Sequence, residues 1–200
     1  MAAPMRKSNR QRVPASERRD ALIDAAIHEF AATGYHGTPV DRIARAVGVA
    51  QPYVFSLFGS KRDLFLAAVE RCHERVREVL AGAAASHATD APDDVSVSHW
   101  IGNAYVDLLT TDRDLLMLQL QSYAACDDPV IRERVRTDFT MLARLVRDLL
   151  GPDAPEQELE EFFRYGMLIN VSAAMGVETM AGGGWIIEAI GPPHDSDERD

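Results

Sequence analysis

Apolar residues recur along most of this chain at intervals of three and four, the spacing that places them on one face of an α-helix. The first such stretch follows Ser16, a residue type suited to cap a helix N-terminus, and stops at Gly34. Its apolar positions form a single stripe at Ile23, Ala26, Ile27 and Phe30. The pattern predicts an amphipathic helix between Ser16 and Gly34.

The next two predicted helices are short and lie close together in the sequence. Thr38 is suited to cap the first of them, and Pro39 fits its first turn, where a missing N–H is harmless. This helix ends at Gly48, and the next covers residues 50–58.

Three residues in this stretch have the sizes that a helix-turn-helix requires. Ala44 is small enough for two helices to cross closely, and Gly48 can adopt the positive φ of a tight turn. Val54 fills the gap between the two helices. A helix-turn-helix enters the major groove of DNA with its second helix, so the pattern favours a nucleic-acid interface.

Helical periodicity continues through the rest of the chain, and no strand-like alternation appears. Asp112 and Asp128 are suited to cap two of these helices, with Pro129 in the first position after Asp128. A loop is predicted over residues 86–94, and three glycines at 182–184 precede a short apolar helix over 185–190. The longer predicted helices cover residues 61–84, 95–110, 112–126, 128–150 and 156–179. The predicted fold class is all-α.

Charge divides the chain into two parts. Residues 1–62 contain ten Lys or Arg against five Asp or Glu, a net charge of +5, whereas the remaining residues sum to −15. A whole-chain charge of −10 would by itself disfavour a nucleic-acid partner. The division confines the capacity to bind a polyanion to the N-terminal part.

Residue types that carry catalysis or bind metals show no characteristic spacing. The two cysteines are far apart, and the six histidines have no H-x-x-x-H or H-E-x-x-H spacing. A G-x-S-x-G sequence and a P-loop are also missing from the sequence. We therefore expect neither an enzyme nor a metal or cofactor site. With no run of about 18 apolar residues and no secretory signal, we expect a cytoplasmic protein without membrane contact.

The run A-A-I-H-E-F-A-A-T-G-Y-H-G-T-P-V-D-R-I-A-R-A-V-G-V, followed by F-G-S-K-R-D-L-F, resembles the tetracycline-repressor (TetR) family of bacterial regulators. The resemblance covers residues 18–65. It implies a homodimeric repressor with an N-terminal three-helix DNA-binding domain and a C-terminal helical ligand-binding and dimerisation domain. It also implies a double-stranded DNA operator and a small-molecule inducer as partners. The expected organisation is a flexible basic arm (1–15), a helix-turn-helix domain (16–60), a helical ligand-binding and dimerisation domain (61–190) and a disordered acidic tail (191–200).

The resemblance implies, by position, candidate DNA contacts on and around the second and third helices. Gln51 is the best candidate for reading a base edge, because a carboxamide pairs bidentately with adenine. The others are suited to phosphates, and the arm could in addition reach a minor groove. The full set is Thr38, Arg42, Arg45, Gln51, Pro52, Tyr53, Ser56 and Lys61. Ser56 and Leu57 stand where family members often carry aromatic or His residues.

Bulky and semi-polar residues of the middle helices are the candidates for an inducer pocket, although most such residues are plain core. The set is Trp100, Tyr105, Met117, Gln121, Tyr123, Phe139, Phe163, Met167 and Asn170. The acidity of this part of the chain would favour a cationic ligand only if the acids faced the pocket.

Small and apolar residues near the C-terminal end permit close helix approach, and a symmetric four-helix bundle would cover them. The predicted dimer interface contains Phe163, Gly166, Met167, Asn170, Val171, Ala174, Val177, Trp185 and Ile186.

Two other functions remain open at this level. One is a helical enzyme or small-molecule carrier whose N-terminal module mediates protein contact. The other is an architectural DNA binder without an inducer. A ligand that shifts the melting temperature would argue against the architectural binder.

Overall fold

The computed structural model describes residues 14–176, which form eight helices. They are α1 (Ala15–Gly37), α2 (Val40–Ala46), α3 (Gln51–Phe58), α4 (Lys61–Asp90), α5 (Val97–Thr111), α6 (Arg113–Ala124), α7 (Pro129–Leu150) and α8 (Glu156–Ala174). The all-α prediction is confirmed for this part of the chain. The predicted arm and acidic tail, and the predicted helix over 185–190, lie outside the described residues.

The helix-turn-helix is built as its residue sizes predict. Ala44 and Val54 are buried where α2 and α3 meet. Gly48 has a φ of 71° in the turn between the two helices. The N–H of Val49 donates to the carbonyl oxygen of Ala44 over 2.9 Å, which closes the turn.

The two predicted caps at the N-terminal end of the domain are wrong. α1 begins one residue before Ser16, with Pro14 at the cap position and no side-chain cap hydrogen bond. α2 begins at Val40, so Pro39 takes the cap position that was predicted for Thr38. The Thr38 hydroxyl is instead 2.7 Å from the carbonyl oxygen of Gly34, because it satisfies the end of the preceding helix.

α4 is six residues longer than predicted and includes part of the predicted loop. Ser60 caps its start by accepting from the N–H of Asp63. Near the other end, the indole N–H of Trp100 donates to the carbonyl oxygen of Ala83 over 3.0 Å. The helix continues because residues 81–88 are rich in alanine, a strong helix former, and because α5 folds back to contact it.

The later helices follow their predicted caps. Asp112 accepts from the N–H of Leu115, and Asp128 accepts from the N–H groups of Val130 and Ile131. Pro129 occupies the first turn of α7, as predicted. α8 ends at Ala174, short of the predicted residue 179.

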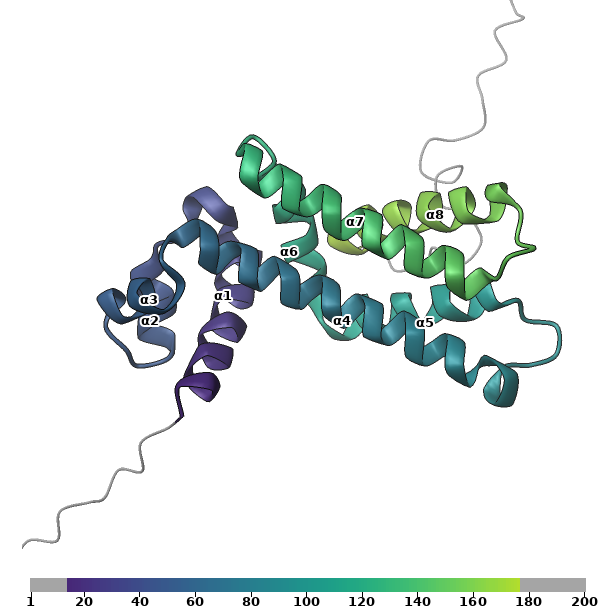
Figure 1. Ribbon diagram of the computed structural model, residues 1–200, viewed down its shortest axis with the longest axis horizontal. Coiled ribbons are helices and arrows are strands. Elements are labelled where there is room, and N and C mark those ends of the chain that lie inside the picture. The colour runs from purple at the N-terminus through teal and green to yellow at the C-terminus, as the bar shows by residue number, and fades with distance from the viewer. Residues whose placement is uncertain (1–13, 177–200) are drawn as a thin grey trace, which may run out of the picture.

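The helices form two packed groups joined by α4 (Figure 1). α1, α2 and α3 make up one end of the molecule, and α4 runs from there along α5 to α8. α1 packs on α4 through the Phe30 and Phe65 rings, whose centroids are 4.9 Å apart. It also packs on α6, so the two groups share one continuous apolar core.

Candidate functional site

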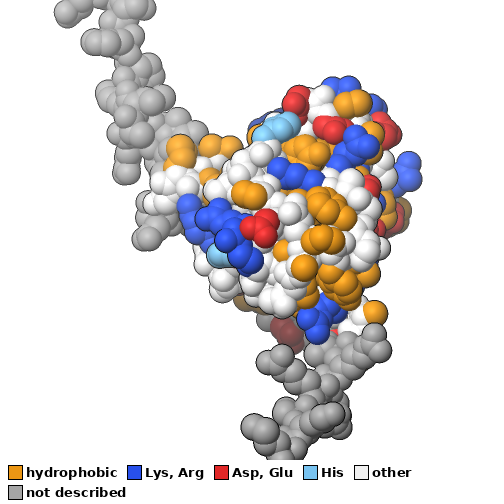
Figure 2. All heavy atoms as spheres, turned by 90° about the vertical axis from the view of Figure 1, so that its left-hand side faces the viewer, with side chains coloured by type: hydrophobic (Ala, Val, Ile, Leu, Met, Phe, Trp, Pro, Cys, Tyr) orange, Lys and Arg blue, Asp and Glu red, His pale blue; other side chains and the backbone are white. Residues whose placement is uncertain are grey.

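The outward face of α3 is exposed to solvent. Tyr53 is 39% exposed, Pro52 and Ser56 are exposed, and Gln51 is half-buried. Figure 2 looks onto this end of the molecule and shows Lys and Arg side chains gathered beside a band of apolar ones. The sequence-predicted tip of α3 is therefore on the surface.

Several of the candidate polar groups already have partners within the domain. Arg42 pairs with Glu29 over 3.1 Å, and Arg45 with Asp41 over 2.7 Å. The hydroxyl of Ser56 donates to the carbonyl oxygen of Tyr53 over 2.8 Å. The guanidinium groups keep free N–H donors at these distances, since each Arg has five.

Lys61 lies at the start of α4, beside the end of α1. Its ammonium donates to the carbonyl oxygen of His36 over 3.2 Å and lies 5.3 Å from the centroid of the Tyr35 ring. Partial burial lowers the pKa of Lys61 below its ordinary value. The group has two further N–H donors that can face a phosphate.

Thr38 is the candidate that the structure removes from the surface. It is buried, and its hydroxyl lies within hydrogen-bonding distance of the carbonyl oxygens of Gly34 and Glu29 and of the Thr33 hydroxyl. Because the hydroxyl is hydrogen-bonded inside the domain, it is not available for the predicted phosphate contact.

Phe55 is an exposed residue of α3 that the sequence interpretation missed. It is 38% exposed and lies one turn from Gln51 and Pro52 on the helix. Its spacing of four from Gln51 indicates a shared helix face and could have pointed to it.

Three pairs of charged or titratable side chains tie α1 and the start of α4 to α6 and to the residues just before α7. Nδ1 of His28 lies 2.7 Å from Oδ2 of Asp114, and this carboxylate raises the pKa of His28 because it accepts a hydrogen bond from the ring and carries a negative charge. His36 lies 3.4 Å from Asp127. Arg62 donates to Asp128 over 3.2 Å, so the residue that caps α7 also contacts α4.

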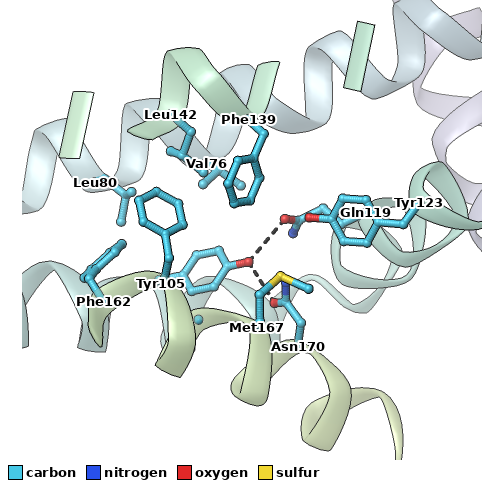
Figure 3. A pocket seen from close by; sticks show the side chains of 12 residues that line it. Val76, Leu80, Tyr105, Gln119, Tyr123, Phe139, Leu142, Phe162, Met167 and Asn170 are labelled. Atoms are coloured by element: carbon cyan, nitrogen blue, oxygen red, sulfur yellow. Dashed lines mark hydrogen bonds between the residues drawn. The ribbon is translucent and has the colours of Figure 1, made fainter. Parts of the chain in front are cut away.

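A pocket lies between α4, α5, α6, α7 and α8 (Figure 3). It encloses about 370 Å³, including the space open to solvent at its mouth. Six of the predicted ligand residues line it: Tyr105, Tyr123, Phe139, Phe163, Met167 and Asn170. The structure brings them together from four different helices.

The other three predicted ligand residues do not line this pocket. Trp100 is turned to the end of α4 by its indole hydrogen bond, and Met117 packs against the core. Gln121 lies where α6 meets α1, since a Cβ added at Gly34 would be 2.6 Å from its side-chain oxygen. These positions depend on helix packing that the sequence pattern does not specify.

Lining residues that the sequence interpretation missed are mostly apolar. Val76 and Leu80 are four apart on α4, a spacing that could have indicated a shared face. Gln119 is a polar residue within an apolar stretch of α6, and that contrast was also an available signal. The complete set is Val76, Leu80, Gln119, Leu142, Phe162 and Gly166.

α8 presents apolar side chains both inward and outward. Val171 is 46% exposed and Met167 is also exposed, whereas Phe163, Gly166 and Ala174 are half-buried. Asn170 is buried and bonded to the Tyr105 hydroxyl, so its predicted place in a dimer interface is wrong. The predicted interface residues Val177, Trp185 and Ile186 lie outside the described residues.

Metal-ligand clusters and membrane-spanning helices are both absent from the described part of the chain. Among residues 14–176, no three His, Cys, Asp or Glu side chains come together as metal ligands do. None of the helices in this range combines the length and the apolarity needed to cross a bilayer.

The architecture is that of a helix-turn-helix DNA-binding domain carried on an all-helical second domain. Residues 22–68 match the model of the bacterial regulatory proteins of the tetR family. This N-terminal stretch is therefore similar in sequence to the DNA-binding domain of the tetR family.

Named relatives match the same N-terminal region. The transcriptional activator FasR of Mycolicibacterium smegmatis is 42% identical over 60 residues, which are 30% of this chain and 27% of FasR. The biofilm operon negative regulator IcaR of Staphylococcus aureus is 31% identical over 62 residues, 31% of this chain and 33% of IcaR. The matched stretch thus spans about a third or less of these relatives.

Solved structures share the fold over most of the chain. A TetR-like regulator from Rhodococcus sp. RHA1 has a TM-score of 0.64 at 21% identity, covering 90% of this chain and 96% of that one. FadR from Bacillus subtilis, solved in complex with stearoyl-CoA, has a TM-score of 0.64 at 15% identity, covering 86% and 96%. The C-terminal helices therefore have the arrangement of TetR-like proteins, although their sequence matches are low.

Proposed function

We propose that this protein is a cytoplasmic, homodimeric transcriptional repressor that binds an inverted-repeat operator and leaves it when a small molecule occupies the C-terminal helices. The observation that carries the proposal is the exposed outward face of α3 on a buried helix-turn-helix scaffold. Polar and aromatic groups projecting from a rigid second helix are suited to enter the major groove.

Within this proposal, residues of α2, α3 and the start of α4 make different kinds of contact with DNA. Gln51, at the first turn, faces base edges and pairs with adenine, because its carboxamide offers one donor and one acceptor side by side. Tyr53, Ser56 and Lys61 contact phosphates and fix the register of the domain on the duplex. Arg42 and Arg45 add attraction to the backbone from α2, and Pro52 and Phe55 pack on sugar or base surfaces.

The exposed apolar face of α8 supports a homodimer. Val171 and Met167 on this helix, and Met175 directly after it, have large exposed fractions, and a symmetric partner would bury them. A dimeric helix-turn-helix protein that reads two successive major grooves has its two recognition helices about one turn of DNA apart, roughly 34 Å. The operator is therefore an inverted repeat.

The pocket and its connection to α4 support control by a small molecule. α4 contributes Val76 and Leu80 to the pocket wall and begins at the helix-turn-helix, so a ligand that shifts α4 also shifts α3. The ties from His28 and Arg62 to the C-terminal helices carry the same movement. FadR, which shares this fold, has been solved with a bound small molecule.

The proposal is tested by DNA selection with the full-length protein. Fragments of the host genome are bound in competition with random duplex DNA at several salt concentrations. We expect a few fragments that share an inverted repeat to be retained, with an affinity that falls steeply as salt rises. Equal retention of all fragments, or no retention at any salt concentration, would overturn the proposal.

A further inference from the structure

The wall of the pocket carries no charge. Its twelve lining residues are apolar or aromatic, apart from two carboxamides and two tyrosine hydroxyls, and none is Asp, Glu, Lys, Arg or His. The many acidic residues of positions 63–200 thus contribute no side chain to the pocket wall. An ion that entered would lose its hydration with no opposite charge to replace it.

Three polar side chains meet at one side of this apolar wall (Figure 3). The Tyr105 hydroxyl lies 2.7 Å from Oδ1 of Asn170 and 3.2 Å from Oε1 of Gln119. Burial raises the pKa of Tyr105, so its hydroxyl keeps its proton. A single proton serves only one of the two oxygens at a time, and the shorter distance favours Asn170.

Gln119 is left with an amide group that has no partner. Its side chain is 3% exposed, and its Nε2 is buried without any hydrogen-bond acceptor in the described part of the chain. An unsatisfied buried N–H is costly, because the group has given up its hydrogen bonds to water. In a pocket wall, this cost is removed when a bound molecule supplies the acceptor.

We propose that the pocket binds an uncharged molecule with an apolar body and one carbonyl oxygen, which accepts a hydrogen bond from Nε2 of Gln119. The apolar body lies against Phe139, Phe162 and Phe163, and the carbonyl points to the side where Gln119 lies beside Tyr105 and Asn170. This assignment rests on the proposed ligand-responsive function and specifies the class of ligand.

The test uses four small probes with the same phenylbutyl frame and the full-length protein. They are the ketone 4-phenyl-2-butanone, the hydrocarbon butylbenzene, the 4-phenylbutylammonium cation and the 4-phenylbutanoate anion. Affinities are measured by calorimetry for the wild type, for Gln119→Leu and for Gln157→Leu, which replaces an exposed glutamine on α8 as a control.

We expect Gln119→Leu to weaken the ketone about tenfold and to leave butylbenzene unchanged or tighter, because only the ketone loses a hydrogen bond. Gln157→Leu changes neither. The cation and the anion bind at least about tenfold more weakly than the ketone in the wild type. Equal losses for ketone and hydrocarbon, binding of either ion as tight as that of the ketone, or no binding of any probe would overturn the assignment.

A second measurement does not depend on the folding of a variant. The carbonyl stretching frequency of the bound ketone is recorded in the wild type and compared with its value in hexane. A hydrogen bond from Nε2 lowers the frequency, and an unshifted band for bound ketone contradicts the proposal.

Operator binding without any probe separates this inference from the proposed function. Gln119→Leu should retain wild-type DNA affinity, since Gln119 lies in the pocket and not at α3. If DNA binding holds while the probe pattern fails, only the ligand class is wrong. If sequence-selective DNA binding is absent, the proposed function fails whatever the probes show.

Discussion

Gly34 is required both for the turn from α1 into α2 and for the close approach of α6. It ends the regular part of α1 with a φ of 72° and a ψ of 174°, a combination that is essentially restricted to glycine and costs other residues about 1–3 kcal/mol. Its missing side chain also leaves room for Gln121 of α6. Its backbone carbonyl accepts from both the N–H and the hydroxyl of Thr38, so the turn into α2 depends on it.

We therefore expect Gly34→Ala to lower the free energy of unfolding by about 1 kcal/mol, mainly through backbone strain. The measurement is urea unfolding at one fixed protein concentration. Gly82→Ala is the matched control, because Gly82 lies in the interior of α4 with nothing within 4 Å of an added Cβ. That change should raise stability by roughly 0.5–1 kcal/mol. Equal effects of the two substitutions would refute the role of Gly34.

His28 provides a titratable tie between α1 and α6. The hydrogen bond from the His28 ring to Asp114 raises the pKa of His28, so the pair is intact below the ordinary histidine value of about 6.5 and is lost as pH rises through the raised value. We expect Asp114→Asn to lower the pKa of His28, measured by NMR titration of its ring protons. Asp153→Asn, at an exposed position before α8, should leave the titration unchanged. A His28 pKa that is the same in all three proteins contradicts the contact.

At this scale, steric requirements could be predicted from the sequence, whereas polar partners could not. Ala44, Gly48 and Val54 occupy the predicted places because their sizes allow few alternatives within a short turn. Thr38 was misplaced because its hydroxyl bonds to the carbonyl end of the preceding helix, and Gln121 was misplaced because its position depends on how α6 packs on α1. A hydroxyl next to a helix end has several acceptors within reach, and the sequence does not select among them.

α3 is the element on which DNA recognition depends. Its inner face is fixed by Val54 and Phe58, and its outer face carries Tyr53 at 39% exposure. Tyr53 is exposed, and among residues 14–176 its hydroxyl makes no hydrogen bond, so substitution there tests binding rather than folding.

We expect Tyr53→Ala to weaken DNA binding about tenfold at every selected site, because a phosphate contact carries no sequence information. Fluorescence anisotropy with labelled fragments measures the effect. Val130→Ala, at an exposed position on α7, is the control and should leave affinity unchanged. An unchanged affinity for Tyr53→Ala would remove this residue from the interface.

Helix existence was predictable from periodicity, but helix ends were predictable only where a side chain caps them locally. Asp112 and Asp128 fix two starts through hydrogen bonds to the next residues, and both predictions are confirmed. The predicted end of α4 was wrong because contacts from Trp100 extend the helix. The pocket shows the same limit, since Val76, Gln119 and Phe162 meet only after α4, α6 and α8 have packed.

The whole molecule works as proposed only as a dimer, which brings two copies of α3 to one face. We expect Val171→Asp to yield a monomer, because a carboxylate would be buried in the centre of the apolar α8 face. Val130→Asp is the control. Val130 is 44% exposed and Val171 is 46% exposed, but Val130 lies in the first turn of α7, where an acidic side chain is favourable. Sedimentation velocity should show monomer for the first and dimer for the second. A dimeric Val171→Asp variant would exclude this face as the interface.

In the proposed dimer two copies of α3 read an inverted repeat, and a nuclease footprint on a selected fragment is the most direct test. We expect two protected half-sites related by a two-fold axis, with centres about one helical turn apart, and loss of both in Tyr53→Ala. Protection of a single unrepeated site, or uniform protection along the fragment, would contradict it.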